Sequence, residues 1–132
     1  MAGRRLDPDG PALVIEVAGY LDRGEEPPQG ALRSAVRYLL FTLEATTPGR
    51  SVEVRVPPVA AVQCVAGPRH TRGTPPNVIE MDPVTWFRLA TGRLGWVEAV
   101  GSGAVRASGA RADLSEYLPL NPDVPPADPR PA

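Results

Sequence analysis

The chain has 132 residues, of which 42% are hydrophobic and 22% are charged, as expected for one soluble globular domain and too short for two ordinary ones. The formal net charge of −1 provides no general attraction to nucleic acid or to an anionic membrane, so we expect no nucleic-acid partner. One cysteine excludes an intramolecular disulfide and, together with a single histidine, makes a zinc site implausible, so we expect no metal or other cofactor.

The N-terminal segment predicts a helix. It lacks the apolar core of a signal peptide, and no window approaches ~18 uninterrupted apolar residues, so we expect a cytoplasmic chain without a membrane span. Asp7 followed by Pro8 is typical of a helix start, and Gly24 fits its stop. The helical spacing between them is kept by Leu13, Val14, Val17, Tyr20 and Leu21. We therefore treat residues 1–30 as a helix and a linker that pack on the main domain.

The clearest helix follows at residues 32–43, where apolar residues recur at i, i+3, i+4, i+7, i+8 and i+11. Tyr38 and Phe41 widen this stripe, so the helix needs a broad apolar partner such as a sheet. The segment TPGR at residues 47–50 ends it. The stripe consists of Leu32, Ala35, Val36, Leu39, Leu40 and Leu43.

Three strands are expected next. Residues 51–56 (SVEVRV) alternate between valine and charged side chains, which indicates a strand with one buried face. Pro57 and Pro58 interrupt the pattern, residues 59–67 supply a second strand, and residues 78–81 (VIEM) supply a third. Because only short breaks separate them, we expect the three strands to pair in antiparallel fashion.

The C-terminal half alternates helix and strand signals. Asp82 followed by Pro83 repeats the signature of a helix start, and Gly92 fits the left-handed residue that ends a helix. We expect a second short helix up to about residue 103, a strand at residues 104–108, and a last short helix from the capping box DLSE through residue 118. The proline-rich residues 119–132 predict a disordered tail. The fold class is therefore α+β, with helices and a sheet in two layers.

Candidate reactive residues are few. Cys64 lies within an apolar strand, where a cysteine is usually a small buried hydrophobe, and a pair with His70 across the strand end is the alternative. No G-x-S-x-G pattern is present. Trp86 and Trp96 either anchor the core or line an apolar cavity, where a large ring with one polar atom suits a boundary.

The connection at residues 67–78 (GPRHTRGTPPNV) contains the one histidine of the sequence. Two guanidinium groups and a potentially cationic imidazole suit the capture of a carboxylate or phosphate. The alternative is a solvated hairpin whose arginines pair with nearby acids. Both interpretations of Arg69, His70 and Arg72 stay open at this point.

Three motifs occur together in residues 77–118. A strand runs into an acidic helix cap, an A-T-G-[KR]-L turn follows at residues 90–94, and a V-x-x-x-G strand follows at residues 105–109. This order resembles the C-terminal half of sterol carrier protein domains, and the whole chain looks most like their actinobacterial branch. The resemblance implies a domain at residues 31–118, with a largely antiparallel five-stranded sheet covered by helices around an apolar tunnel.

The resemblance implies a non-enzymatic carrier of a fatty acyl, sterol-like or other lipid ligand, because the family shares no catalytic residues. Arg69, His70 and Arg72 would contact an acidic head group. The rival interpretations are an interaction module with a self-filled cavity that acts through dimerisation or a protein partner, and an enzyme based on His70. Transient membrane contact and a homodimer are both compatible with the sequence. The residues expected near the cavity are Leu39, Leu43, Val62, Cys64, Met81, Trp86, Phe87 and Leu89.

Overall fold

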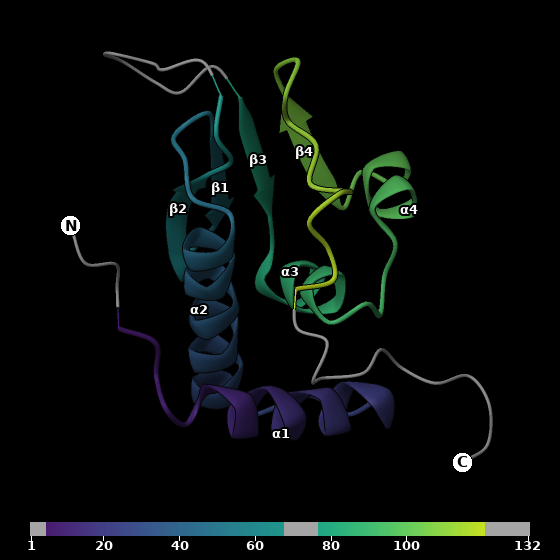
Figure 1. The fold of residues 1–132 in the computed structure, drawn as a ribbon. Helices are drawn as coiled ribbons and strands as arrows, with labels where there is room; N and C mark the ends of the chain where they lie inside the picture. Colours follow the sequence, from purple (N-terminus) through teal and green to yellow (C-terminus); the bar gives the residue numbers. More distant parts are fainter. Residues whose placement is uncertain (1–4, 68–76, 121–132) are drawn as a thin grey trace.

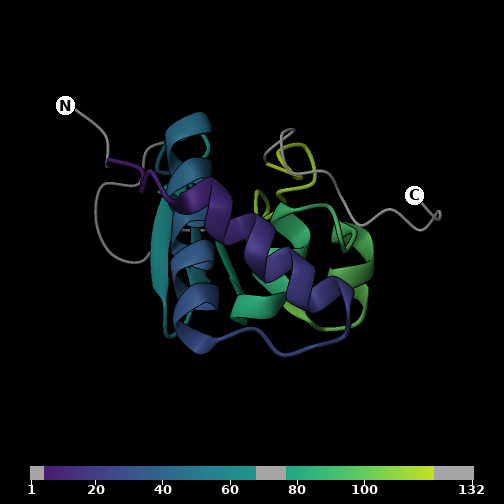
Figure 2. The same cartoon turned by 90° about the horizontal axis from the view of Figure 1, so that it is seen from below.

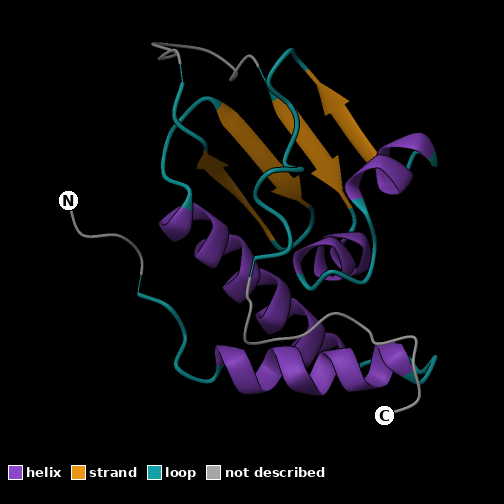
Figure 3. Ribbon diagram, turned by 45° about the vertical axis from the view of Figure 1, so that its right-hand side comes forward, coloured by secondary structure: helices purple, strands orange, loops and turns teal. Residues whose placement is uncertain are grey.

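The computed structural model of the chain describes residues 5–67 and 77–120 and has an α+β fold. Helix α2 lies over β1 and β2, and α4 lies beside β4 (Figure 1). Figure 3 shows the strands as one layer. No helix in the described ranges is long and apolar enough to cross a membrane. The elements are α1 (Gly10–Asp22), α2 (Gln29–Thr46), β1 (Val52–Val56), β2 (Ala60–Cys64), β3 (Val78–Met81), α3 (Pro83–Ala90), α4 (Trp96–Gly101) and β4 (Val105–Ser108).

The sheet of the described residues has four strands in the order β2-β1-β3-β4, so the expected number of five is wrong. Two of its three pairings are antiparallel, but the sheet is mixed, and the expected antiparallel pairing of all of the first three strands is wrong. Strand β1 pairs with β2 in antiparallel fashion, as expected, but it pairs with β3 in parallel. The reason is that β3 joins the far side of β1 rather than the edge of β2. Residues 65–77, which connect β2 to β3, are more numerous than a hairpin loop requires, so sequence order does not force the two strands to pair.

The core lies between α2 and the sheet, as the two apolar patterns predict. Val52, Val54 and Val56 of β1 are fully buried, and so are Leu39, Leu40 and Leu43 of the α2 stripe, whereas Leu32 at its start is half-buried. On the opposite face of β1, the Arg55 guanidinium contacts the Glu53 carboxylate. Full burial of a valine or leucine side chain stabilises the fold by roughly 1.5–3 kcal/mol relative to leaving that side chain exposed. The predicted one-sided strand and its broad helical partner are both confirmed.

Helix α1 crosses α2 on the outside of the molecule (Figure 2). It begins at Gly10, slightly later than the Asp7-Pro8 signal indicates, and Asp7 accepts a hydrogen bond from the backbone N–H of Asp9 at 2.9 Å. Val14 and Val17 are fully buried. The close approach requires glycine at position 10, because a Cβ there would lie 2.1 Å from the Tyr38 ring.

The C-terminal half confirms the predicted helix signals except the last. Asp82 caps α3 by accepting a hydrogen bond from the Thr85 N–H at 2.7 Å, and Gly92 has the expected positive φ of 79°. The helix expected at residues 113–118 is wrong: residues 115–117 form a turn. Its capping-box aspartate, Asp113, instead accepts a hydrogen bond from Ser115, only two residues on, at 2.8 Å. That bond closes a local Asx turn, which competes with the helix start.

Candidate functional site

The eight residues expected near a cavity are all placed in the packed interior. Their exposed fractions run from 0% to 3%, and they lie in α2, β2, β3 and α3. Leu89 also lines a surface hollow described below. A role of all eight in ligand binding stays a prediction. The eight are Leu39, Leu43, Val62, Cys64, Met81, Trp86, Phe87 and Leu89.

Two of these residues have a clear structural role. The Trp86 indole N–H donates a hydrogen bond to the Val36 carbonyl oxygen at 3.3 Å, so its fully buried ring ties α3 to α2. The Cys64 thiol has its pKa raised to about 12, chiefly by burial and secondarily by the nearby Glu44 carboxylate. A thiol with such a pKa is protonated at neutral pH, so Cys64 acts as a small buried hydrophobe.

The candidate anion contacts Arg69, His70 and Arg72 lie outside the described residues. The first described residue after these three is Asn77, which is 4% exposed. Its side-chain amide donates to the Ser51 carbonyl oxygen at 2.7 Å and accepts from the Arg111 N–H at 2.9 Å. Asn77 therefore fastens residues before β1 and after β4 to the start of β3, a role that the sequence analysis missed.

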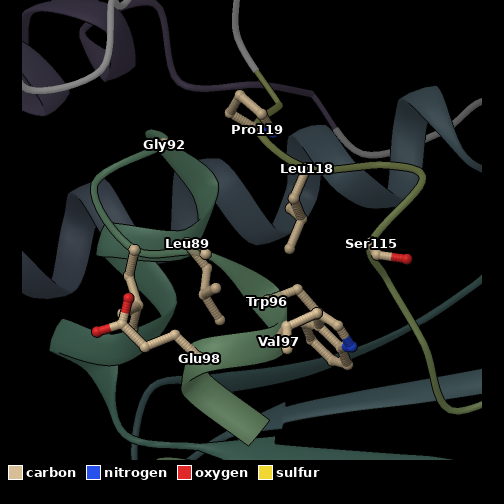
Figure 4. A pocket seen from close by; sticks show the side chains of 10 residues that line it. Leu89, Gly92, Trp96, Val97, Glu98, Ser115, Leu118 and Pro119 are labelled. Carbon is tan, nitrogen blue, oxygen red and sulfur yellow. The ribbon is translucent and has the colours of Figure 1, made fainter. Parts of the chain in front are cut away.

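A surface hollow of about 400 Å³ lies between α3, α4 and the C-terminal segment at residues 109–120; we call it the α4 hollow. Figure 4 shows its side chains converging from the α3–α4 turn, from α4 and from the C-terminal segment. Most of the side chains that line it are apolar. The lining residues are Leu89, Gly92, Leu94, Gly95, Trp96, Val97, Glu98, Ser115, Leu118 and Pro119.

Both walls of the α4 hollow are held by hydrogen bonds. Gly92 ends α3, and the Arg93 guanidinium then makes a two-pronged ion pair with Asp22 of α1, with Nε–Oδ1 at 2.8 Å and Nη2–Oδ2 at 2.9 Å. Arg93 holds the pKa of the Asp22 carboxyl below its ordinary value. On the other wall, the Leu120 N–H donates to the Ala90 carbonyl oxygen at 2.9 Å. The hollow is therefore bounded by two anchored segments.

The exposed surface beside the hollow is also apolar. Val97 is 83% exposed and Val100, one turn further along α4, is 39% exposed. Trp96 is half-buried and lines the hollow, so the structure divides the two tryptophans between the two roles considered, with Trp86 in the core and Trp96 at a cavity wall. An apolar wall with an aromatic ring at its boundary suits binding of an apolar molecule. Within the described ranges, no cluster of three acidic, histidine or cysteine residues could hold a metal.

A second hollow of about 300 Å³ on the outer side of the sheet has a different lining. Met81 lies there, but so do Asp82 and the Glu80 carboxylate, which is ion-paired with Arg106. Its charged side chains favour water rather than an apolar ligand. The α4 hollow is therefore the better candidate for an apolar ligand.

Sequence reasoning identified Leu89 and named Trp96 as a potential cavity residue, but it missed Leu94, Val97 and Leu118. The A-T-G-[KR]-L turn was the available signal, because Gly92 and Leu94 belong to it and both line the hollow. A family described as bacterial SCP (sterol carrier protein) orthologs matches residues 28–120. The match leaves out α1 and includes every residue that lines the α4 hollow. Among curated proteins, no match to the chain was found.

Proposed function

Since the chain belongs to the bacterial sterol carrier protein family, we propose that it binds an apolar small molecule or lipid in the α4 hollow. The observation that carries the proposal is the apolar wall of this hollow, which lies wholly within the matched residues. Its volume of about 400 Å³ falls within the ~300–1,000 Å³ range of small-molecule sites. The proposed site thus differs from the interior tunnel that the resemblance implies.

Binding would rest on burial of apolar area. At roughly 25 cal/mol per Å², a ligand that hides about 200 Å² of apolar surface gains about 5 kcal/mol before the costs of association. The exposure of Val97 supports an open site, from which a ligand can leave without unfolding of the core. Modest affinity and fast exchange suit a carrier better than a storage protein.

The proposal includes no catalytic step. Sterol carrier domains are in general non-enzymatic, and the buried, protonated Cys64 offers no reactive thiolate. The remaining candidate for catalysis, His70, lies outside the described residues. We therefore propose binding or transfer of a lipid as the function.

A matched pair of variants on one helix tests the proposal. Val97 lines the hollow, whereas Val100 is exposed on α4 but does not line it. We expect Val97→Asp to weaken binding of 1-decanol to the delipidated protein at least tenfold, because it places a charge in the apolar wall, and Val100→Asp to change binding less than twofold. Isothermal titration calorimetry measures both. Equal effects of the two variants would contradict a site in the α4 hollow.

A second candidate function is an interaction module without a small ligand. It is favoured by the close packing of the eight residues expected near a cavity, together with the exposed Ile15, Val97 and Val100. Such a module would associate through the exposed valines of α4. Sedimentation of the chain over a range of concentrations distinguishes the two functions, because a dimer that Val97→Asp dissociates would favour the interaction module.

A further inference from the structure

The polar groups of the α4 hollow are few and unevenly placed. Among the ten lining side chains, three carry polar atoms: Trp96, Glu98 and Ser115. In Figure 4 the indole nitrogen of Trp96 lies toward the C-terminal segment that carries Ser115, and the Glu98 carboxylate lies on the opposite side of the hollow. A bound molecule would therefore meet the Trp96 indole N–H at one end and a negative charge at the other.

One of these groups, the Trp96 indole, offers a donor to a ligand. Within the described residues, the Trp96 indole N–H makes no hydrogen bond and its nitrogen is not cut off from solvent. The Ser115 hydroxyl, by contrast, is hydrogen-bonded to the Asp113 carboxylate and lowers the pKa of that carboxyl. The other tryptophan differs, because the Trp86 indole is bonded to Val36. An indole N–H can only donate, so it is satisfied by an acceptor such as a hydroxyl, carbonyl or ester oxygen.

The charges around the hollow do not favour an anion. Glu98 is the one charged residue among the ten that line it, and the exposed Asp113 and Glu116 flank Ser115 in the chain. The nearest arginine in the sequence, Arg93, is already paired with Asp22 through two hydrogen bonds. A carboxylate or phosphate in this hollow would lose water without gaining a free cation, and it would be repelled by Glu98.

We propose that the α4 hollow selects apolar ligands whose head group is uncharged and accepts a hydrogen bond, such as an alcohol, a ketone or an ester, over carboxylates and phosphates of the same chain length. This inference rests on the proposed function of the hollow. The Trp96 indole N–H binds the head group, and Glu98 excludes anions. This preference for uncharged head groups is the opposite of the preference for acidic head groups that Arg69, His70 and Arg72 would give.

Two ligands that differ only in the head group test this selectivity. The delipidated protein is titrated with 1-decanol and with decanoate at pH 8, where the carboxylate is ionised, below the solubility limit of each. We expect the alcohol to bind about three- to tenfold more tightly. Glu98→Gln should strengthen the binding of decanoate and so reduce the ratio of the two affinities. Trp96→Phe keeps an aromatic ring but removes the donor, so it should weaken the binding of 1-decanol about two- to fivefold.

The outcomes separate the head-group inference from the function on which it rests. Tighter or equal binding of decanoate in the wild type would overturn the inference and leave an apolar ligand site standing. So would a preference for the alcohol that neither Glu98→Gln nor Trp96→Phe changes. Failure of both ligands to bind would overturn the proposed function as well.

Discussion

The interior between α2 and the sheet and the α4 hollow are both apolar, but only the interior is closed. Long, regular elements close it: Leu39, Leu40 and Leu43 of α2 and the valines of β1 are fully buried. The hollow is bounded instead by the short helix α4, a glycine turn and the C-terminal segment, which contributes Leu118 and Pro119 from residues without helix or strand structure. Short elements present too few side chains to fill the space between them. Apolar composition alone therefore does not distinguish a core from a binding surface.

Thiol labelling should show the largest difference between the two regions. At pH 8 the Cys64 thiol, with a pKa of about 12, has roughly 10³-fold less thiolate than an ordinary exposed cysteine. We expect an added Val97→Cys to react with iodoacetamide at least about 10³-fold faster than Cys64 in the folded protein, and mass spectrometry measures both rates. Unfolding in urea is the control, because it should make the two rates similar. Rapid labelling of Cys64 in native buffer would show that the interior is open.

Replacement of a leucine by alanine should lower the free energy of unfolding more in the interior than at the hollow. Leu39 is fully buried, so Leu39→Ala should lower the free energy of unfolding by about 2–5 kcal/mol through lost burial and the cavity left behind. Leu118, half-buried at the wall of the hollow, should cost about 1 kcal/mol or less when replaced by Ala. Urea unfolding followed by circular dichroism measures both values. Similar losses of stability at the two positions would contradict the distinction between a closed interior and an open α4 hollow.

The two tryptophans allow the stability of the two regions to be compared with the same substitution, Trp to Phe, at both positions. Trp86→Phe removes the hydrogen bond to the Val36 carbonyl oxygen and leaves space in the core, so we expect a loss of about 1–3 kcal/mol. Trp96→Phe should change the free energy of unfolding by less than about 0.5 kcal/mol, because the Trp96 ring is half-buried at the surface. The same unfolding experiment applies. A larger loss at Trp96 than at Trp86 would reverse the roles assigned to them.

These contrasts also show what the sequence could and could not predict. The α2 stripe and the alternation in β1 each repeat over many residues, so the elements and the buried faces followed from the pattern. The parallel pairing of β1 with β3 did not follow, because a local pattern contains no information about which strand edge is occupied. The α4 hollow brings together Leu89, Val97 and Leu118, and their convergence depends on the tertiary placement of two turns. The eight residues expected near a cavity were recognised as apolar, but the pattern could not distinguish packed residues from cavity walls.

The smallest difference expected between two matched variants concerns the ion pair that ties the turn beside the hollow to α1. Arg93 lowers the pKa of Asp22, so the folded state binds this proton more weakly than the unfolded state. The stabilisation is complete above the unfolded pKa of ~3.9 and is lost as the pH falls through the lower, folded value. Because Asp22 is partly exposed, Asp22→Asn should lower stability at pH 7 by only about 0.5–1 kcal/mol.

Unfolding measured at pH 7 and near pH 3 tests this prediction, since the difference between wild type and Asp22→Asn should shrink at the lower pH. Glu25→Gln is the matched control, because both partners of the Arg23–Glu25 pair are more than half exposed. It should change stability by ~0.2 kcal/mol or less. An Asp22→Asn effect no larger than this control would mean that the pair does not fasten the turn.

The indole resonances of the two tryptophans give the most direct test of the central claim, that an apolar ligand binds at the α4 hollow and not in the closed interior. Titration of ¹⁵N-labelled, delipidated protein with 1-decanol should shift the Trp96 indole N–H signal, because Trp96 lines the hollow. The Trp86 signal should stay in place, because its N–H is buried and bonded to Val36. A shift of the Trp86 signal with an unchanged Trp96 signal would place the ligand in the interior and contradict the claim.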